Sequence, residues 1–337
     1  MGLKNLGNTC YMNSIMQQLY MIPAFRKAML EVDDSKFGVE PNDQNALYQI
    51  KRIFGGLMEL EKLFYNPKRL CGALKNMDGS PIDPLVQQDV DEFFNMLIDR
   101  IENLIKGTKE EKVMKNLFCG ALANQFISQQ CPHVKEREEL FMAIQLDVKA
   151  RHSLKESLEK YVEGEMLEGD NAYYCEKCDA KRDTLKRTTL KRFPNILFLE
   201  LKRFEFNFDL MAKIKINELV EFPMELDMTP YSYHHIQRAD LQAKMEESNI
   251  SPEDLTEDET ATLNRVLTPD YYQYSLKGVV VHHGTADSGH YYSFIKDREG
   301  SECWFEFNDD KVTPFNAEDI PAECYGGENE HFEQQMR

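Results

Sequence analysis

The spacing of apolar residues changes along the chain: it is helical in the first part and typical of strands in the second. After Asn8-Thr9, apolar residues recur at helical spacing and Pro23 ends the run; they are Met12, Ile15, Met16 and Leu19. A longer stripe follows Asp89, a good N-cap with Glu92 three positions later, as in a capping box. It consists of Val90, Phe93, Phe94, Leu97, Ile98, Ile101, Leu104 and Ile105. Both stretches are predicted to be helices.

Short apolar runs in the second half predict strands. The runs at 196–201 and 276–281 are typical of buried strands. Two aromatic-rich runs at 290–296 and 302–307 flank a polar segment that contains Gly300, which predicts a hairpin. Helices first and strands second indicate an α+β fold. A polar, acidic stretch at 228–270 predicts a surface insertion with a short helix.

Charge and cysteine content narrow the class of protein. The net charge of −18 argues against a nucleic-acid surface, which needs clustered Lys and Arg, but it permits a basic protein partner. No apolar run is long enough to span a bilayer, and the N-terminus lacks the apolar core of a signal peptide. Eight cysteines without a secretion signal indicate reduced thiols with catalytic or metal-binding roles. We therefore expect a cytoplasmic location, with the nucleus as a second one, and no membrane insertion.

Cys10 is the candidate nucleophile. It lies in the first turn of a predicted helix, where unpaired N–H groups and the helix dipole favour a thiolate. Most cysteines only fill space in a core, so this position alone is weak support. The approach to the helix contains Gly2, Asn5 and Gly7, and such a flexible polar loop can direct amides at an oxyanion.

A cysteine nucleophile needs an imidazole to take its proton and a partner that orients the imidazole. His290 begins one predicted strand and Asn308 ends the next, with their midpoint inside the predicted turn. We therefore expect these two residues to lie directly opposite each other, although a slip of one residue would bring Asp309 to His290 instead. A lone strand histidine is more often structural, and the facing acceptor favours catalysis. Of Tyr291 and Tyr292, one ring is expected to line a narrow substrate channel and the other to join the core; strand alternation puts Tyr292 on the face of His290 and makes it the candidate substrate-binding residue.

Two cysteine-containing clusters predict a metal site. Cys175 and Cys178 form a CxxC, half of a zinc ribbon, and Cys131 and His133 add a thiolate and an imidazole upstream. Together they make a Cys₃His set suited to a tetrahedral structural Zn²⁺. A redox dithiol is the rival interpretation, but no thioredoxin-like βαβ pattern surrounds the CxxC.

Four blocks of the sequence resemble the conserved boxes of the ubiquitin-specific proteases. Residues 2–14 resemble the cysteine box, and residues 289–293 with 307–309 resemble the histidine box. Two further blocks, at 87–93 and 201–204, match in the family's order, so the resemblance covers nearly the whole chain. The segments 17–23 and 167–173 are similar to the fat-facets-type subgroup, whose members are usually catalytic segments of very large proteins. The resemblance therefore implies an excised catalytic domain.

The resemblance also implies an architecture. It is the papain-like right hand of this family, in which a helical thumb, a β palm and zinc-bearing β fingers hold ubiquitin. The implied divisions of the single catalytic domain, 1–337, are a thumb at 1–115, fingers at 116–190, and a palm at 191–337 that includes the acidic insertion.

The activity implied by the resemblance is that of a deubiquitinating thiol protease, which hydrolyses the (iso)peptide bond after the C-terminal glycine of ubiquitin through a thioester. Asn5 and the backbone N–H of Cys10 are then the oxyanion donors. The residues that grip ubiquitin's basic tail are Gln87, Asp89 and Glu92. The family more often has Asp at position 308, and because a neutral amide stabilises the imidazolium less, Asp309 can share or take the role.

Three other functions compete with this interpretation. They are a non-catalytic ubiquitin-binding scaffold, a protease for another ubiquitin-like modifier, and a zinc-dependent interaction module. A scaffold predicts loss of the nucleophile or base, whereas Cys10, His290, Asn308 and Asn5 are all present. We therefore expect an enzyme, a monomeric catalytic domain whose partners are ubiquitin and ubiquitinated proteins.

Overall fold

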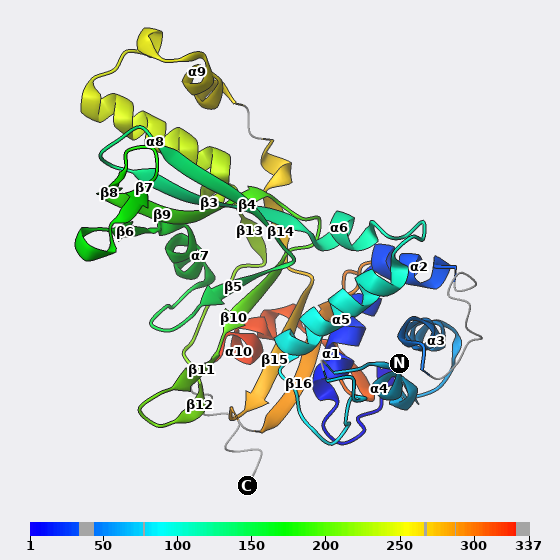
Figure 1. Ribbon diagram of the computed structural model, residues 1–337. Helices are drawn as coiled ribbons and strands as arrows, with labels where there is room; N and C mark the ends of the chain where they lie inside the picture. Colours follow the sequence, from blue (N-terminus) through cyan, green and yellow to red (C-terminus); the bar gives the residue numbers. More distant parts are fainter. Residues whose placement is uncertain (34–43, 77, 266–267, 287, 328–337) are drawn as a thin grey trace. The chain divides into compact units, whose positions relative to one another are not determined.

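The computed structural model describes residues 1–33, 44–76, 78–265, 268–286 and 288–327 (Figure 1). These residues form two compact units, each built from separated stretches of the chain. Unit 1 comprises Met1–Leu117, Phe204–Asn217 and the stretch from Lys277 onwards, and unit 2 comprises Phe118–Arg203 and Glu218–Leu276. Helices dominate the beginning of the chain and strands the later part, which confirms the α+β fold class.

Unit 1 contains both helices that the apolar spacing predicts, α1 and α5. Helix α1 starts at Cys10, and helix α5 starts after Asp89, whose side chain accepts a 2.8 Å bond from the backbone N–H of Asp91. This is the predicted N-cap. The helices are α1 (Cys10–Tyr20), α2 (Pro23–Glu31), α3 (Ala46–Glu59), α4 (Lys68–Ala73), α5 (Val90–Ile105), α6 (Val113–Phe118, which ends in unit 2) and α10 (Ile320–Cys324).

An antiparallel sheet of four strands supports helix α1. It contains β15 (Gly278–Gly284), β16 (Gly289–Lys296), β17 (Trp304–Asn308) and β18 (Lys311–Phe315), paired in that order. Helix α1 packs on β16, and Ser293 on that strand donates to the carbonyl of Ser14. The remaining strands of unit 1 form two-stranded pairs: β1 (Gly2–Leu3) with β2 (Phe64–Tyr65), and β11 (Phe204–Asn207) with β12 (Ala212–Lys215).

The register of the hairpin β16–β17 differs from the predicted one. Ser293 pairs with Phe307, so His290 and Asn308 are diagonal neighbours and not directly opposed. The cause is a longer turn: the backbone N–H of Asp297 bonds the carbonyl of Cys303, and β17 begins at Trp304 and not at residue 302. A shift of two residues keeps every side chain on its predicted face. His290 and Asn308 therefore still share a face.

Unit 2 is built on a second antiparallel sheet of four strands, in the order β4-β3-β9-β6, with helix α7 against it. Its core contains Phe141, Ile144, Leu146, Leu158 and Leu190. The strands are β3 (Gly120–Ser128), β4 (Val134–Phe141), β5 (Ala143–Asp147), β6 (Glu165–Leu167), β7 (Tyr173–Cys175), β8 (Ala180–Arg182), β9 (Thr184–Arg192), β10 (Phe198–Lys202), β13 (Glu225–Asp227) and β14 (Gln273–Ser275), and the helices are α7 (Leu154–Glu163), α8 (Tyr233–Ser248) and α9 (Glu257–Asn264).

Two predicted elements of unit 2 differ in detail. Strand β10, predicted as buried, is only half-buried, because it pairs with β5 alone in a two-stranded parallel sheet. The acidic stretch contains two helices, and α8 is 16 residues long where a short helix was predicted. The length of α8 was underestimated because the helix has little apolar periodicity: Leu241 is its one buried residue, so its sequence has no apolar stripe to mark its extent. An ion pair of 2.5 Å between Arg187 of β9 and Asp240 fastens α8 to the sheet.

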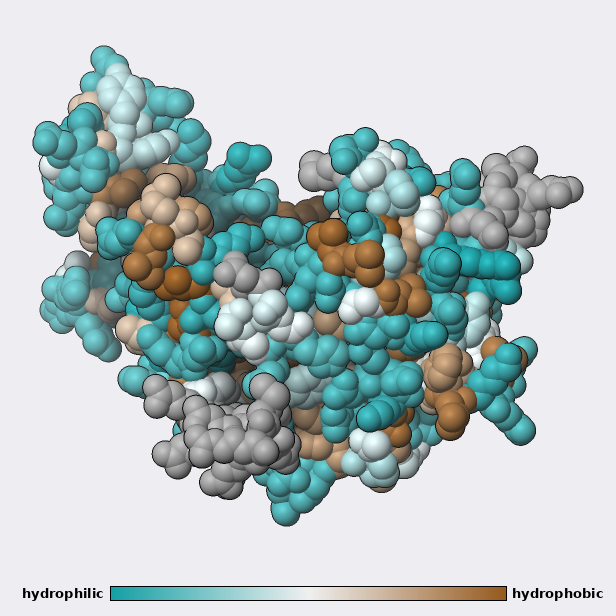
Figure 2. Space-filling view, turned by 90° about the horizontal axis from the view of Figure 1, so that it is seen from below, coloured by the Kyte–Doolittle hydropathy of each residue, from teal (hydrophilic) through white to brown (hydrophobic). Residues whose placement is uncertain are grey.

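The surface agrees with the charge of the sequence. Hydrophilic residues predominate on the face in Figure 2, and hydrophobic atoms lie there in separate groups. Among the described residues, no helix is both long enough and apolar enough to cross a bilayer.

Candidate active site

The loop before α1 is held in shape by Asn5. Its Oδ1 accepts bonds from the backbone N–H groups of Gly7, at 2.9 Å, and Thr9, at 3.2 Å. Gly7 has a φ of +138°, and a Cβ there would lie 3.0 Å from the carbonyl oxygen of Pro84. Because a side chain does not fit at Gly7, the loop can pass close to residues 84–85 and present Cys10 at the first turn of the helix.

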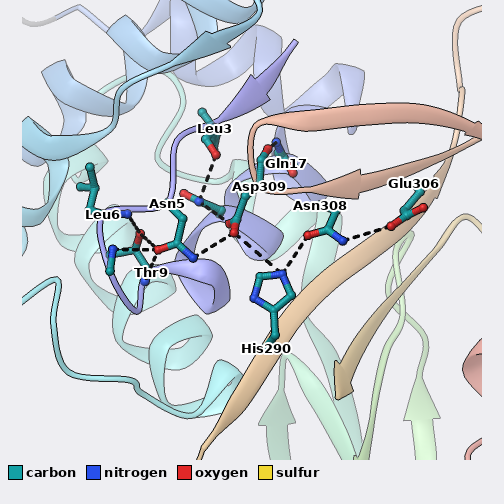
Figure 3. A network of polar contacts seen from close by, with 11 residues as sticks. Leu3, Asn5, Leu6, Thr9, Gln17, His290, Glu306, Asn308 and Asp309 are labelled. Carbon is teal, nitrogen blue, oxygen red and sulfur yellow. Dashed lines mark hydrogen bonds and ion pairs between the residues drawn. The ribbon is translucent and has the colours of Figure 1, made fainter. Parts of the chain in front are cut away.

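Asp309 connects this loop and helix α1 to the sheet (Figure 3). Its carboxylate accepts one bond from Asn5 Nδ2, at 2.9 Å, and one from Asn13 Nδ2, at 2.8 Å. Its backbone carbonyl accepts from the N–H of Leu3, at 2.8 Å. The residue has a φ of +51° in the tight turn between β17 and β18, a conformation that aspartate tolerates better than most residues. Segments from both ends of the sequence therefore meet at one carboxylate.

His290 contacts Asn308, Asp309 and Cys10. Its Nε2 lies 2.8 Å from Oδ1 of Asn308 and 3.8 Å from Oδ2 of Asp309. The other ring nitrogen, Nδ1, is left for the Cys10 thiol, which is buried. Both candidates for the third position thus lie near the ring, with Asn308 in direct hydrogen-bond contact.

The surroundings of His290 favour its charged form. The pKa of His290 is raised to about 9, first by its hydrogen bond with Cys10 and then by its hydrogen bond with Asn308 and the charges of Cys10 and Asp309. Burial of the ring acts in the opposite direction. A nearby histidine behaves in the opposite way. Burial, with the charges of Lys215, His283 and His290, lowers the pKa of His282 to about 4. Of these two imidazoles, only His290 is both beside the thiol and easily protonated, as a base requires.

The predicted tail-binding residues lie around the start of α5. Gln87 Oε1 accepts from the backbone N–H of Gly289, directly before His290, at 3.2 Å. The Asp89 carboxylate caps α5, and Glu92 is exposed in the first turn of that helix. All three are therefore in the same unit as Cys10. Their role in binding a substrate stays a prediction.

The two tyrosines after His290 divide between the faces of β16. The ring of Tyr292 lies 6.2 Å from that of His290, as strand alternation predicts, but its charged neighbours are Glu323 and Glu306. Tyr291 points the other way, and its hydroxyl, whose pKa is raised by burial, lies near Asp89, Cys10 and Glu92. Sequence reasoning chose Tyr292 over Tyr291 for the site, because alternation identifies a face but not which face meets α5.

Two further residues of the site were missed from the sequence. Asn13 binds Asp309, and Glu306 accepts a bond of 3.2 Å from Asn308 Nδ2. The sequence does contain a signal for Asn13. Polar residues recur at intervals of four at Thr9, Asn13 and Gln17, so they share one face of a buried helix. Polar residues on such a face need partners.

A second group of side chains, in unit 2, can hold a metal ion. Cys131 and His133 lie after β3, and Cys175 and Cys178 lie on the hairpin β7–β8. Their ligand atoms are all within 4.8 Å of one another. The Sγ atoms of Cys131 and Cys175 are 3.9 Å apart, and His133 Nδ1 is 3.3 Å from Sγ of Cys178. Ligands about 2.3 Å from a tetrahedral zinc have nearly these separations, so the donor set fits the ion.

Comparison with known proteins gives matches along the whole chain. A family model described as ubiquitin carboxyl-terminal hydrolase matches residues 1–330. Human ubiquitin carboxyl-terminal hydrolase 24 is 41% identical over 331 residues, which cover 97% of this chain and 12% of that protein. Human ubiquitin carboxyl-terminal hydrolase 9Y is 35% identical, covering 100% and 15%, and ubiquitin carboxyl-terminal hydrolase puf of Drosophila melanogaster is 38% identical, covering 97% and 8%. The chain therefore spans less than a sixth of the length of each of these relatives.

Proposed function

Because the chain belongs to the ubiquitin carboxyl-terminal hydrolase family, as its sequence motifs predict, we propose that it is a deubiquitinating thiol protease that hydrolyses the (iso)peptide bond after the C-terminal glycine of ubiquitin. The observation that supports this activity best is the hydrogen bond of 2.8 Å between His290 and Asn308, together with the interaction of the same ring with the thiol of Cys10. A thiol, an imidazole and an orienting amide are the groups that nucleophilic attack on a carbonyl requires.

The reaction has two stages. Cys10 gives its proton to Nδ1 of His290, and the resulting thiolate attacks the carbonyl carbon of the terminal glycine. His290 returns the proton to the departing amine, which leaves a thioester between Cys10 and ubiquitin. The ring then takes a proton from water, and the hydroxide that forms attacks the thioester and releases ubiquitin with a free carboxylate.

The oxyanion of each tetrahedral intermediate needs hydrogen-bond donors. The proposed donors are the backbone N–H of Cys10 and the side-chain amide of Asn5. One N–H of that amide is already bonded to Asp309 and its Oδ1 holds the loop, so the amide has a fixed orientation. An amide nitrogen carries two hydrogens, which leaves one for the oxyanion. A donor fixed before the reaction stabilises charge that appears only in the transition state.

The tail of ubiquitin is basic and extended, and we assign its binding to Gln87, Asp89 and Glu92. The two carboxylates can form charge-assisted bonds with arginines of the tail. Tyr291 joins this set, since its hydroxyl lies near both carboxylates and the nucleophile. Tyr292 packs beside His290 and supports the base.

Zinc is the proposed ion at Cys131, His133, Cys175 and Cys178, because thiolates and imidazole in a four-ligand set favour it over Mg²⁺ or Ca²⁺. When bound, it crosslinks two hairpins of unit 2. The division into thumb, fingers and palm, a monomeric state, and a location in the cytoplasm and the nucleus also remain part of this proposal.

Reaction with ubiquitin that bears an electrophile at its C-terminus tests the function. We expect a single covalent adduct, mapped by peptide mass spectrometry to Cys10 and not to the other seven of the eight cysteines. A panel of ubiquitin-like modifiers with the same electrophile serves as the control. No adduct with ubiquitin would reject the proposed activity, and an adduct with a different modifier alone would change the substrate.

Asp309→Asn is expected to reduce kcat by about 10²-fold, since the variant loses a charge beside the base and one acceptor for Asn5 and Asn13. The negative charge of Asp309 helps to raise the pKa of His290 to about 9, so its removal lowers that pKa. As pH rises, kcat/KM of the variant should therefore fall at a lower pH than kcat/KM of the wild type. Asp310→Asn, at the adjacent exposed carboxylate, is the control. A profile for Asp309→Asn identical to that of Asp310→Asn would contradict the prediction.

A further inference from the structure

Glu306 and Asn308 stand two residues apart on β17, so their side chains project from the same face. Asn308 Nδ2 donates to Oε1 of Glu306 at 3.2 Å, and Asn308 Oδ1 lies 2.8 Å from Nε2 of His290. The three side chains form an unbroken series from a carboxylate through an amide to the imidazole (Figure 3). We propose that Glu306 is a positioning residue: its carboxylate fixes which end of the Asn308 amide faces His290. This inference rests on the proposed function, because it concerns the base of that reaction.

The chemistry of the two groups determines the orientation. An asparagine amide has donors on its nitrogen and an acceptor on its oxygen, whereas a carboxylate only accepts. With Glu306 ionised, a reversed amide would set two oxygens against each other and leave the carboxylate without its donor. Glu306 therefore holds Nδ2 toward itself and Oδ1 toward His290.

The orientation of the amide selects the tautomer of the base. Since Oδ1 of Asn308 only accepts, Nε2 of the neutral His290 ring must carry the hydrogen. The lone pair is then on Nδ1, which is the nitrogen left to accept the proton of Cys10. An aspartate at position 308 would accept through either oxygen and would not need this help. The unusual asparagine and the glutamate two residues before it thus form a functional pair.

Glu306 also contributes charge. A neutral Asn308 stabilises the imidazolium less than an aspartate would, and the Glu306 carboxylate adds a negative charge one hydrogen bond further away. Asp309, at 3.8 Å from Nε2, adds a second. The other titratable groups that face this series are Cys10, His282, Tyr292 and Glu323, and burial followed by the charge of Glu306 raises the pKa of Glu323.

The first test replaces Glu306 alone and measures hydrolysis of a fluorogenic ubiquitin amide. Glu306→Ala is expected to lower kcat about ten- to hundredfold, as the loss of a charge-assisted hydrogen bond predicts, with KM unchanged. The basic side of its pH profile should move to lower pH, because His290 loses a stabilising anion. Glu302→Gln is the matched control: it removes an exposed carboxylate of the same hairpin, which pairs with Lys296. Equal kcat and equal profiles for the two variants would overturn the proposal.

A second test uses rescue, which a merely structural role does not predict. Asn308→Asp alone places two carboxylates in contact, and we expect it to lower kcat. Asn308→Asp combined with Glu306→Gln removes the repulsion and supplies an amide donor, so activity should return to at least the wild-type value. Equal effects of Asn308→Asp in both backgrounds would contradict the pairing. Melting temperatures of all variants identify any that fail to fold.

The tautomer of His290 can be measured without any substrate, from the ¹⁵N shifts of its ring at a pH well above its raised pKa of about 9, where the ring is neutral. We expect the Nε2–H form in the wild type and a mixture of both forms in Glu306→Ala. A wild type that does not react with the ubiquitin electrophile would reject the proposed function, whereas the ring shifts would still decide the role of Glu306. An unchanged Nε2–H form in Glu306→Ala would reject that role.

Discussion

Cys10→Ala is expected to lower turnover of a ubiquitin amide by about 10⁴-fold or more, because no other described group in the site can form the thioester. Affinity for ubiquitin should remain, since the proposed tail contacts come from Gln87, Asp89, Glu92 and Tyr291 and not from Cys10. Cys10 is only 2% exposed, and the change from thiol to methyl removes one buried atom, so the fold should tolerate it. Steady-state kinetics and calorimetric titration with ubiquitin measure the two effects separately.

Cys71→Ala provides the control for this prediction. Cys71 is also buried in unit 1, and burial raises the pKa of Cys71 to about 11, so it remains a thiol at neutral pH. We expect this variant to keep the wild-type kcat. Turnover by Cys10→Ala comparable to that of Cys71→Ala would show that the nucleophile lies elsewhere.

Cys178→Ser is expected to abolish binding of zinc and to lower the melting temperature by about 10 °C, because a metal crosslink between two hairpins is lost. Cys178 is half-exposed, so a hydroxyl in place of its thiol adds little cost of its own. The metal content of the purified protein and a thermal melt provide the two measurements. Excess chelator should bring the melting temperature of the wild type down to that of the variant.

The exposed Cys303, which lies outside the metal cluster, supplies the comparison. Cys303→Ser should leave both zinc content and melting temperature unchanged. Wild-type protein that contains no zinc, or a Cys178→Ser variant that keeps one zinc per chain, would rule out the proposed ligand set.

The parts of the site that depend on neighbouring residues in the sequence could be predicted from it. The apolar stripes and the N-cap at Asp89 identified α1 and α5, since helical spacing and capping are local properties. The CxxC and the Cys-x-His pair gave the metal cluster, because each pair is only a few residues long. Alternation along β16 and β17 gave the shared face of His290 and Asn308, even though the register differed by two.

The parts that depend on contacts between distant segments could not be predicted in the same way. Asp309 was considered only as a residue that shares or takes the role of Asn308 beside His290, yet it binds Asn5 and Asn13, from the opposite end of the sequence. No spacing rule relates such residues, and the geometry follows from how α1 packs on the sheet. The length of the hairpin turn was likewise set by its internal hydrogen bonds, including that between Asp297 and Cys303.

The construction of unit 1 from both ends of the sequence has a consequence for biosynthesis. The backbone N–H of Leu3 bonds the carbonyl of Asp309, and Cys10 needs His290. The site around Cys10 is therefore incomplete until the sheet of β15 to β18 has formed. At a translation rate of about 5–20 residues per second, the ribosome makes the base roughly a quarter of a minute to a minute after the thiol. During that interval the nascent chain has a thiol with no imidazole beside it. The proposed protease therefore cannot act until the strand that contains His290 has left the ribosome and folded.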